Sequence, residues 1–234
     1  MSGPRLTAVI VLLGVFGALL YQFGLFVMVV WLKFHDPGSS SFMRNTLTEL
    51  LAQDPEATLV QEWVPSARIS NNLKRAVIAA EDANFVNHGG VEWDAIRRAF
   101  EYNIEMADAG RNAVRGGSTI SQQLAKNLFL SSDRSYLRKG QELILTYMIE
   151  AVMSKERILE LYLNVAQWGV NIFGAQAASR HYFGRDADQL NASQAARLAA
   201  MLPNPAFYHS RGNTGYLQAR TATLLRRMPM VKIP

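Results

Sequence analysis

Apolar residues dominate the N-terminal end of the chain, where no charged side chain occurs from Leu6 to Leu32. A helix over this segment would extend about 40 Å, which exceeds the roughly 30 Å hydrocarbon core of a bilayer. A cleaved signal peptide is the alternative, but its apolar region usually spans about 7–15 residues and ends at small residues. The run here is longer and ends in the bulky Val30-Trp31-Leu32. We therefore predict an uncleaved transmembrane helix over 6–32.

The flank before this helix, residues 1–5, is short and contains no acidic side chain. A short tail that precedes a long domain commonly stays in the cytoplasm. We therefore expect the body of the protein to lie on the outer side of the membrane.

The body shows helical periodicity almost throughout. Apolar residues recur every three or four positions over Asn71–Phe85, before the stop signal Gly89-Gly90. Thr119–Leu130 begins with Thr119 and Gln122 at the spacing of a capping box. These patterns predict a helix over each segment.

Further helices are predicted towards the C-terminus. Glu142–Asn164 reads as one long amphipathic helix, and Asn191–Leu202 begins with an Asn-x-x-Gln cap and stops before Pro203. No stretch alternates convincingly with period two, and we find no internal repeat. The body is predicted to be one mainly α domain.

Composition adds exclusions and a charge pattern. The chain lacks cysteine, which excludes disulfides, thiolate zinc sites and a thiol nucleophile. The net charge is +5, and the basic excess is concentrated in 111–157 and 191–234. Nucleic-acid-binding proteins more often spread basic residues along one face with interleaved aromatic residues, and no such module is present. Nucleic acid is therefore not an expected partner.

The first candidate for chemistry is the segment Glu81–Gly90. On a continuous helix, Glu81, Phe85 and His88 would share one face. An acid that follows a buried stripe can be desolvated, which raises its pKa and suits a general base. The alternative is a surface acid paired with Lys74 or Arg75. A metal site at Glu81 and His88 has little support, because no recognised histidine ligand spacing occurs.

The second candidate is Gly116–Asn127. Two glycines precede a hydroxyl-rich helix start, whose N–H groups and dipole would favour an anion. A polar stripe follows, consisting of Thr119, Gln123, Lys126 and Asn127. An ordinary capped surface helix is the alternative. No Gly-Lys-Ser/Thr follows at P-loop spacing, so a P-loop is excluded.

The third candidate is Arg138–Glu142, which has two adjacent cations and a glutamate. A salt-linked surface turn is the commoner explanation. Together with Lys126 and Arg134, however, these cations would surround the candidate anion site. A departing diphosphate requires such stabilisation while its bond breaks.

Together these segments resemble the motifs of peptidoglycan glycosyltransferases. Glu81–Gly90 resembles E-D-x-x-F-x-x-H-x-G, and Gly116–Leu130 is nearly identical to the second family motif. Arg138–Glu142 is similar to R-K-x-x-E, and Lys155–Asn164 to K-x-x-I-L-E-x-Y-L-N. The order and spacing also agree, and the likeness runs from about Val64 to Tyr208.

The resemblance implies a mainly α, lysozyme-like two-lobed domain preceded by one transmembrane helix. It divides the chain into a cytoplasmic tail over 1–5, the anchor over 6–32, a linker and membrane-proximal segment over 33–63, and the glycosyltransferase domain over 64–234. In the family, the region corresponding to 100–115 belongs to a mobile lobe that contacts the membrane. The expected location is the cytoplasmic (inner) membrane, with the domain on its periplasmic side.

The resemblance also implies an activity, the polymerisation of lipid II into glycan strands. The 4-hydroxyl of a lipid II acceptor would attack the anomeric carbon of a growing chain held on polyprenyl diphosphate, with inversion. By motif, Glu81 is the general base, and Glu142 is a second catalytic residue at the diphosphate. The residues implied for binding the diphosphate and shaping the donor pocket are Lys126, Arg138, Lys139, Ser118, Thr119, Gln123 and Asn127. Those implied as supports for Glu81 are Asp82, Phe85 and His88.

Some positions depart from the family pattern, and some family features are absent. Ser121 replaces a commoner threonine and keeps the hydroxyl, whereas Gln167 replaces a common glutamate and receives no acid role. No transpeptidase motif set follows, so the resemblance is to the monofunctional class. Glu160 and Asn164 are expected to be structural. The stretch 191–234 is expected to be a solvated helix face, with contact to anionic lipid head groups as the alternative.

The expected partners are lipid II, the growing strand, the membrane and other cell-wall synthesis and division proteins. No cofactor is required by the sequence, although a divalent cation such as Mg²⁺ at the diphosphate is compatible with the chemistry. Two alternatives remain: a lytic hydrolase of lysozyme-like fold, which would not need the cations, and a non-catalytic membrane-anchored scaffold, which would not need Glu81 and Glu142.

Overall fold

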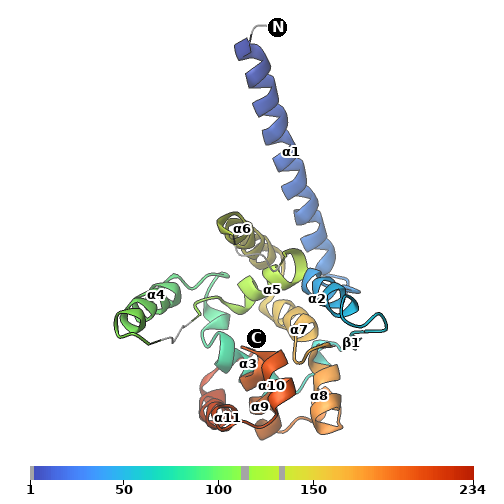
Figure 1. Cartoon of the computed structure of the whole chain (residues 1–234), viewed down its shortest axis with the longest axis vertical. Helices are drawn as coiled ribbons and strands as arrows, with labels where there is room; N and C mark the ends of the chain where they lie inside the picture. Colours follow the sequence, from blue (N-terminus) through green and yellow to red (C-terminus); the bar gives the residue numbers. More distant parts are fainter. Residues whose placement is uncertain (1–2, 112–115, 132–134) are drawn as a thin grey trace.

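The computed structural model describes residues 3–111, 116–131 and 135–234. The predicted anchor is a continuous helix, α1 (Gly3–Leu32), which projects from the body as a long rod (Figure 1). Its segment Thr7–Leu32 is long and apolar enough to cross a membrane. The structure thus confirms the helix and its length.

The lower end of α1 is part of the folded body. Val29 and Leu32 are buried in the hydrophobic core. Arg157 donates hydrogen bonds to the carbonyl oxygen of Leu32 at 3.0 and 3.1 Å, and to that of His35 at 2.7 Å. Because the last carbonyls of a helix lack partners within it, this guanidinium completes the end of α1.

One lobe of the body lies directly below α1 and is built around α5, which packs against α2, α6 and α7 (Figure 1). A two-stranded parallel sheet, with Val60 opposite Ile172, lies at its edge. The elements of this lobe are α2 (Ser41–Leu51), β1 (Val60–Gln61), α5 (Ile120–Phe129), α6 (Tyr136–Val152), α7 (Lys155–Val165), β2 (Ile172–Phe173) and α8 (Ala175–Phe183). Helix α2 lies within the predicted linker, so part of that segment is packed structure.

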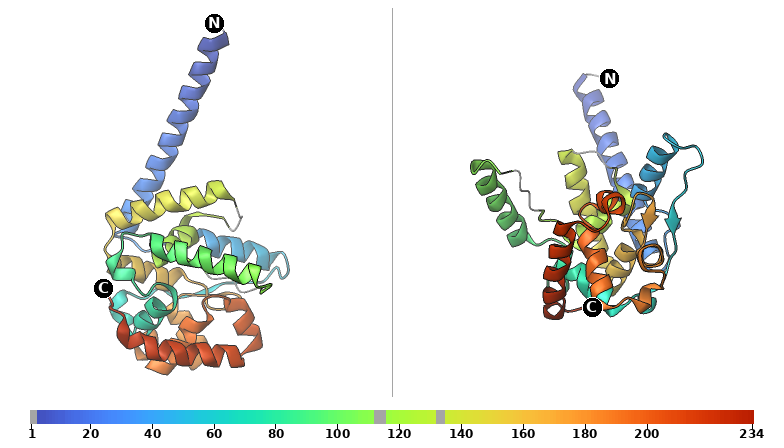
Figure 2. Two further views of the ribbon diagram at one scale, coloured as in Figure 1. Left: turned by 90° about the vertical axis from the view of Figure 1, so that its left-hand side faces the viewer. Right: turned by 60° about the horizontal axis from the view of Figure 1, so that its bottom comes forward.

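The other lobe is formed by α3, α9 and α11, which pack on one another. Helix α4 lies to one side of the body in Figure 1 and in the right-hand view of Figure 2. The remaining elements are the 3-10 helices η1 (Ser66–Arg68), η2 (Phe85–Asn87), η3 (Ala187–Gln189) and η4 (Met228–Met230), and the helices α3 (Asn71–Glu81), α4 (Trp93–Asp108), α9 (Ala192–Met201), α10 (Pro205–Arg211) and α11 (Gly215–Arg227). The mainly helical, two-lobed prediction is confirmed.

Two predicted helix starts are confirmed with their caps. Thr119 and Gln122 form a reciprocal capping box at the start of α5, and Asn191 and Gln194 form one at the start of α9. In each pair, the first side chain accepts from the third helical N–H and the later amide accepts from the cap N–H, so backbone donors without helical partners are satisfied.

Two other helix predictions are wrong. Helix α3 ends at Glu81 rather than Phe85, so Glu81, Phe85 and His88 do not share a helical face. The chain leaves the helix at Asp82, whose carboxylate accepts the backbone N–H of Ile120 at 3.0 Å. A contact between segments distant in sequence therefore overrides the local periodicity.

The predicted helix over Glu142–Asn164 is divided between two helices. Helix α6 begins earlier, at Tyr136, and ends at Val152, and α7 begins at Lys155. Met153 is extended, and the Ser154 side chain caps α7 by accepting from the backbone N–H of Arg157. The serine was the available signal for this break, since such residues favour N-caps over helix interiors.

Asn164 joins α7 to the chain before α3. Its fully buried side chain accepts from the backbone N–H of Val64 at 3.0 Å, and donates to the carbonyls of Val64 and Glu160, each at 2.9 Å. This geometry accords with the structural role expected for Asn164.

We expect Asn164→Leu to destabilise the protein by about 2–4 kcal/mol, because it leaves buried backbone groups without partners. Chemical unfolding monitored by circular dichroism measures the effect. Asn171→Leu is the matched control, since Asn171 donates one side-chain bond, to Thr58, at an exposed position. Equal stability of the two variants would contradict the role of Asn164.

Candidate active site

A cavity of about 820 Å³ opens between the two lobes, beside α4. It is bounded by the C-terminal end of α3, the segment that leads into α5, and α11. The polar and aromatic residues that line it are Glu81, Asp82, Asn84, Glu92, Arg98, Tyr102, Ser118, Thr119, Gln123, Tyr208, Tyr216, Arg220 and Arg227. Of the predicted site residues, Glu81, Asp82, Ser118, Thr119 and Gln123 therefore share one cavity.

Glu81 lies at the cavity wall, in the last turn of α3. Its Oε2 accepts a hydrogen bond from Nε2 of Gln123 at 2.9 Å, and Oε1 of Gln123 accepts from the Tyr162 hydroxyl at 3.0 Å. Burial raises the pKa of Glu81, Asp82 adds to the rise, and Gln123, Arg220 and Lys126 oppose it. A carboxylate with a raised pKa in a cavity has the properties of a general base.

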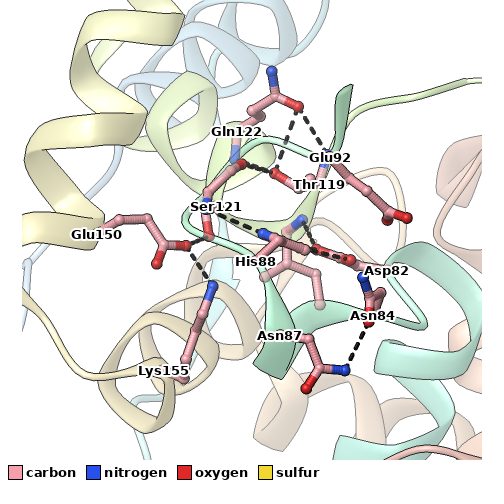
Figure 3. Close-up of polar contacts among 12 residues, drawn as sticks. Asp82, Asn84, Asn87, His88, Glu92, Thr119, Ser121, Gln122, Glu150 and Lys155 are labelled. Atoms are coloured by element: carbon pink, nitrogen blue, oxygen red, sulfur yellow. Dashed lines mark hydrogen bonds and ion pairs between the residues drawn. The ribbon is translucent and has the colours of Figure 1, made fainter. Parts of the chain in front are cut away.

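Asp82 connects the turn after α3 to α5 (Figure 3). Its buried carboxylate accepts from Nε2 of His88 at 2.9 and 3.0 Å, as well as from the N–H of Ile120. Nδ1 of His88 accepts the Gly90 N–H at 3.0 Å, so the neutral imidazole carries its proton on Nε2. Phe85 lies edge-on to the His88 ring. These contacts hold the backbone next to Glu81 and support the positioning role predicted for Asp82, Phe85 and His88.

The predicted anion site at the start of α5 is occupied by the protein itself. The N–H of Ile120 donates to Asp82, that of Thr119 to Gln122, and that of Gln122 to Thr119. The negative charge at this helix terminus is therefore the Asp82 carboxylate. The expectation that these N–H groups remain free for a ligand was wrong.

Gly90 closes this junction and has a φ of +95°, which L-residues rarely adopt. Its carbonyl accepts from the Thr119 hydroxyl at 2.6 Å. An added Cβ would lie 2.7 Å from Cγ of Glu150 and 2.9 Å from Cγ2 of Thr146. The position therefore requires glycine for both conformation and space.

We expect Gly90→Ala to lower the free energy of unfolding by about 1–3 kcal/mol, and to reduce activity by displacing the segment that carries Glu81. Gly89→Ala is the control, because a Cβ there meets nothing within 4 Å. Thermal unfolding of the two variants checks the prediction, and it fails if they are equally stable.

The predicted cationic cluster lies on the first turns of α6. Glu142 is buried and pairs with Arg138 at 3.2 Å and with Lys139. Lys139 also donates to the Ser118 hydroxyl at 3.4 Å, and Ser118 lines the cavity. The cluster therefore borders the cavity through Ser118.

Lys126 interacts electrostatically with both the cationic cluster and Glu81. Burial lowers its pKa, Glu142 opposes that shift, Arg138 and Lys139 lower the pKa further, and Glu81 raises it. Its ammonium also lies 6.0 Å from the centre of the Phe42 ring on α2. Nε of Arg138 is buried without a hydrogen-bond partner among the described residues. Such a donor is expected where a ligand oxygen completes the site.

The remaining residues of the prediction differ in placement. Asn127 is buried on α5 and does not line the cavity. Arg134 lies outside the described residues, as do the last positions of the predicted 100–115 lobe. The rest of that lobe belongs mainly to α4, on which Phe100 and Ile104 are exposed.

Sequence reasoning missed the far wall of the cavity. Arg220 and Arg227 on α11 line it rather than forming only a solvated face, as do Arg98, Tyr208 and Tyr216. Arg220 is close enough to lower the pKa of Glu81. The acid-free C-terminal stretch was the available signal, since isolated basic charge often faces an anionic partner.

The cationic cluster does not itself form a metal site. Among the described residues, Glu142 supplies the carboxylate of this cluster. Its two oxygens already accept hydrogen bonds from Lys139 and Arg138. A separate group of ligand-type atoms, from Asp82, His88 and Glu92, lies within 4.8 Å of one another. Asp82 and His88 are hydrogen-bonded together there. We therefore assign no role to a metal ion at the cationic cluster.

Residues 47–229 match the family model described as transglycosylase. The chain belongs to the transglycosylase family. The matched range contains both lobes, the cavity and the cationic cluster, and it confirms the likeness that the four motifs predict.

Curated relatives match nearly the whole chain. A Bordetella pertussis protein is 66% identical over 217 residues, which are 93% of this chain and 90% of the relative. Proteins of Janthinobacterium sp. and Chromobacterium violaceum are 58% and 50% identical, each over 92% of this chain, and over 92% and 93% of their own lengths. All three are named biosynthetic peptidoglycan transglycosylase.

Proposed function

We propose that this chain polymerises lipid II into linear glycan strands of peptidoglycan. The observation that carries the proposal is the proximity of two chemistries: Glu81, which lines the cavity and has a raised pKa, and the cations around Glu142, which border the same cavity through Ser118. A glycosyl transfer from a diphosphate requires both a base for the acceptor and positive charge for the leaving group. Family membership and the names of the relatives support the same reaction.

In the proposed reaction, Glu81 removes the proton from the 4-hydroxyl of a lipid II acceptor. The hydroxyl oxygen forms a bond to the anomeric carbon of the donor strand as the bond to the diphosphate oxygen breaks, with inversion. Gln123 holds Oε2 of Glu81, and Tyr162 in turn holds Gln123. This chain of hydrogen bonds orients the base towards the cavity.

The undecaprenyl diphosphate leaves with the bonding electron pair. Lys126, Arg138 and Lys139 stabilise its negative charge, and the buried carboxylate of Glu142 orders the two cations on α6. Ser118, Thr119 and Gln123 shape the donor side of the cavity, and Asn127 supports them from within α5. Preorganised charges stabilise a transition state without a reorganisation cost.

The location of the protein is part of the proposal. Helix α1 would cross the cytoplasmic membrane once, and the body would lie on the periplasmic side, where lipid II is consumed. The division into a tail, an anchor, a linker and a domain from residue 64 stays a prediction, as does contact with other cell-wall synthesis and division proteins. The family match begins earlier, at residue 47.

A direct test incubates the purified full chain with lipid II and no nucleotide. We expect long strands that a muramidase digests to disaccharide units. Release of sugars from preformed peptidoglycan, without strand formation, would instead identify the lytic hydrolase. A folded protein without either activity would identify the scaffold.

A further inference from the structure

Gln22 is an amide side chain within the apolar helix α1. It forms a reciprocal pair with Gln141 on α6: Nε2 of Gln22 donates to Oε1 of Gln141 at 2.6 Å, and Nε2 of Gln141 donates to Oε1 of Gln22 at 3.0 Å. Helices α1 and α6 are in contact, and α6 lies beside the lower half of α1 in the figures. The proposed reaction assigns no role to this pair.

An unpaired amide is costly in or near hydrocarbon, because no water replaces its hydrogen bonds. Glutamines that pair across membrane helices therefore hold those helices together in one register. Here each amide satisfies one donor and one acceptor of the other. The pair fixes the height of α6 along the anchor.

The length of α1 places this pair near the outer boundary of the membrane. From Leu6 to Gln22 the helix rises about 24 Å, so Gln22 lies towards the outer edge of a hydrocarbon core of roughly 30 Å. The remaining turns, up to Leu32, run about 15 Å along the body, where Val29 and Leu32 are buried and Arg157 holds the helix end. The lower part of α1 is therefore attached to the body and sets the distance of the body from the bilayer.

Gln141 stands on the turn of α6 that carries the cationic cluster, next to Glu142 and three positions after Arg138. The first residues of α6, Tyr136 and Leu137, are 98% and 88% exposed. An exposed aromatic and aliphatic pair at the start of a helix beside a membrane span fits the headgroup boundary. The cluster then lies at the depth of lipid phosphates.

We propose that Gln22 and Gln141 are positioning residues that clamp α6 to the anchor at the membrane boundary. The clamp holds Arg138, Lys139 and Glu142 at the depth of the diphosphate of a lipid-linked substrate. This inference rests on the proposed function for its substrate, but its geometry can be tested without any activity.

The geometric test uses the absence of native cysteine. In vesicles of phosphatidylethanolamine and phosphatidylglycerol, the full chain with Q22C and Q141C should be cross-linked by a short bifunctional thiol reagent. L20C with Q141C is the control, because Leu20 is exposed and lies on the other side of α1. Equal cross-linking of the two variants would overturn the clamp, whether or not the protein makes strands.

The kinetic test compares Q22L, Q141L and the double variant in the same vesicles. Each single change should lower kcat/KM for lipid II by about three- to tenfold, and the double change by no more than either alone, since one interaction is lost in all three. Replacing both partners by apolar groups should leave the melting temperature unchanged. Q218L, the same change at an exposed position of α11, should keep the wild-type rate.

Rescue separates positioning from general damage. The Q22C and Q141C variant should be slow when reduced and should regain the wild-type rate when cross-linked. Additive losses in the double variant, or no recovery on cross-linking, would overturn the proposal. Absence of strand synthesis by the wild-type protein would instead reject the proposed function and leave the cross-linking result standing.

Discussion

Glu81→Gln is expected to remove nearly all strand synthesis while the protein stays folded. The amide is nearly isosteric and can still accept the hydrogen bond from Gln123, but it cannot take a proton from the acceptor hydroxyl. General-base catalysis contributes about 10²–10⁴-fold, so kcat should fall by that factor. Steady-state assays with lipid II measure it, with Glu101→Gln on the exposed side of α4 as the control.

The raised pKa of Glu81 predicts a second effect, on the pH dependence of stability and activity. Because the folded state binds this proton more tightly than the unfolded chain does, stability contributed by protonated Glu81 is lost as pH rises through its pKa. Glu81→Gln should therefore melt at the same temperature as wild type near neutral pH, or higher. Wild-type activity should decline as pH falls through that raised pKa. A variant that keeps its rate would refute Glu81 as the base.

The helix starts were the most predictable part of the fold, because their signals are local. The capping boxes at Thr119 and Asn191 lie within four residues of sequence and need no tertiary information. The end of α3 was not predictable in this way. It depends on Asp82 meeting the N–H of Ile120, which is far along the chain and comes close only when the lobes assemble.

The same distinction applies to the site. Glu81, Gln123, Lys139 and Glu142 were identified because family motifs name them. In the structure Glu81 and Gln123 line one cavity, and Lys139 and Glu142 border it through Ser118. Arg220 was missed because its pattern on α11 is that of an ordinary amphipathic helix. Only the packing of α11 against α3 and α9 turns that side chain towards Glu81. Periodicity identifies a buried face, but it does not identify the neighbour.

Motif reasoning also misjudged one electrostatic feature. The start of α5 was expected to bind a substrate anion, yet Asp82 already satisfies that terminus. Of the positive groups that the motifs name, those left for a diphosphate are therefore Lys126, Arg138 and Lys139. Since Glu142 already pairs with the two cations on α6, we expect Lys126 to contribute most to stabilising the charge of the diphosphate.

Lys126→Met is accordingly expected to lower kcat by about 10²–10³-fold, the usual effect of removing one preorganised group that stabilises a transition state. Burial lowers the pKa of Lys126, which means that its charge costs folding energy, so the methionine variant should be no less stable than wild type. Lys126→Arg should restore part of the rate, because it keeps the charge with different geometry.

Lys74→Met is the matched control for this prediction. Lys74 lies on α3, is partly buried, and also has a pKa lowered by burial, but the carboxylates that oppose this shift are Glu156 and Glu160 rather than Glu142 and Glu81. Its loss should leave kcat unchanged. If both lysine variants lose activity in proportion to their stability, the charge of Lys126 acts through folding. A selective loss at Lys126, at constant melting temperature, assigns that charge to the departing diphosphate.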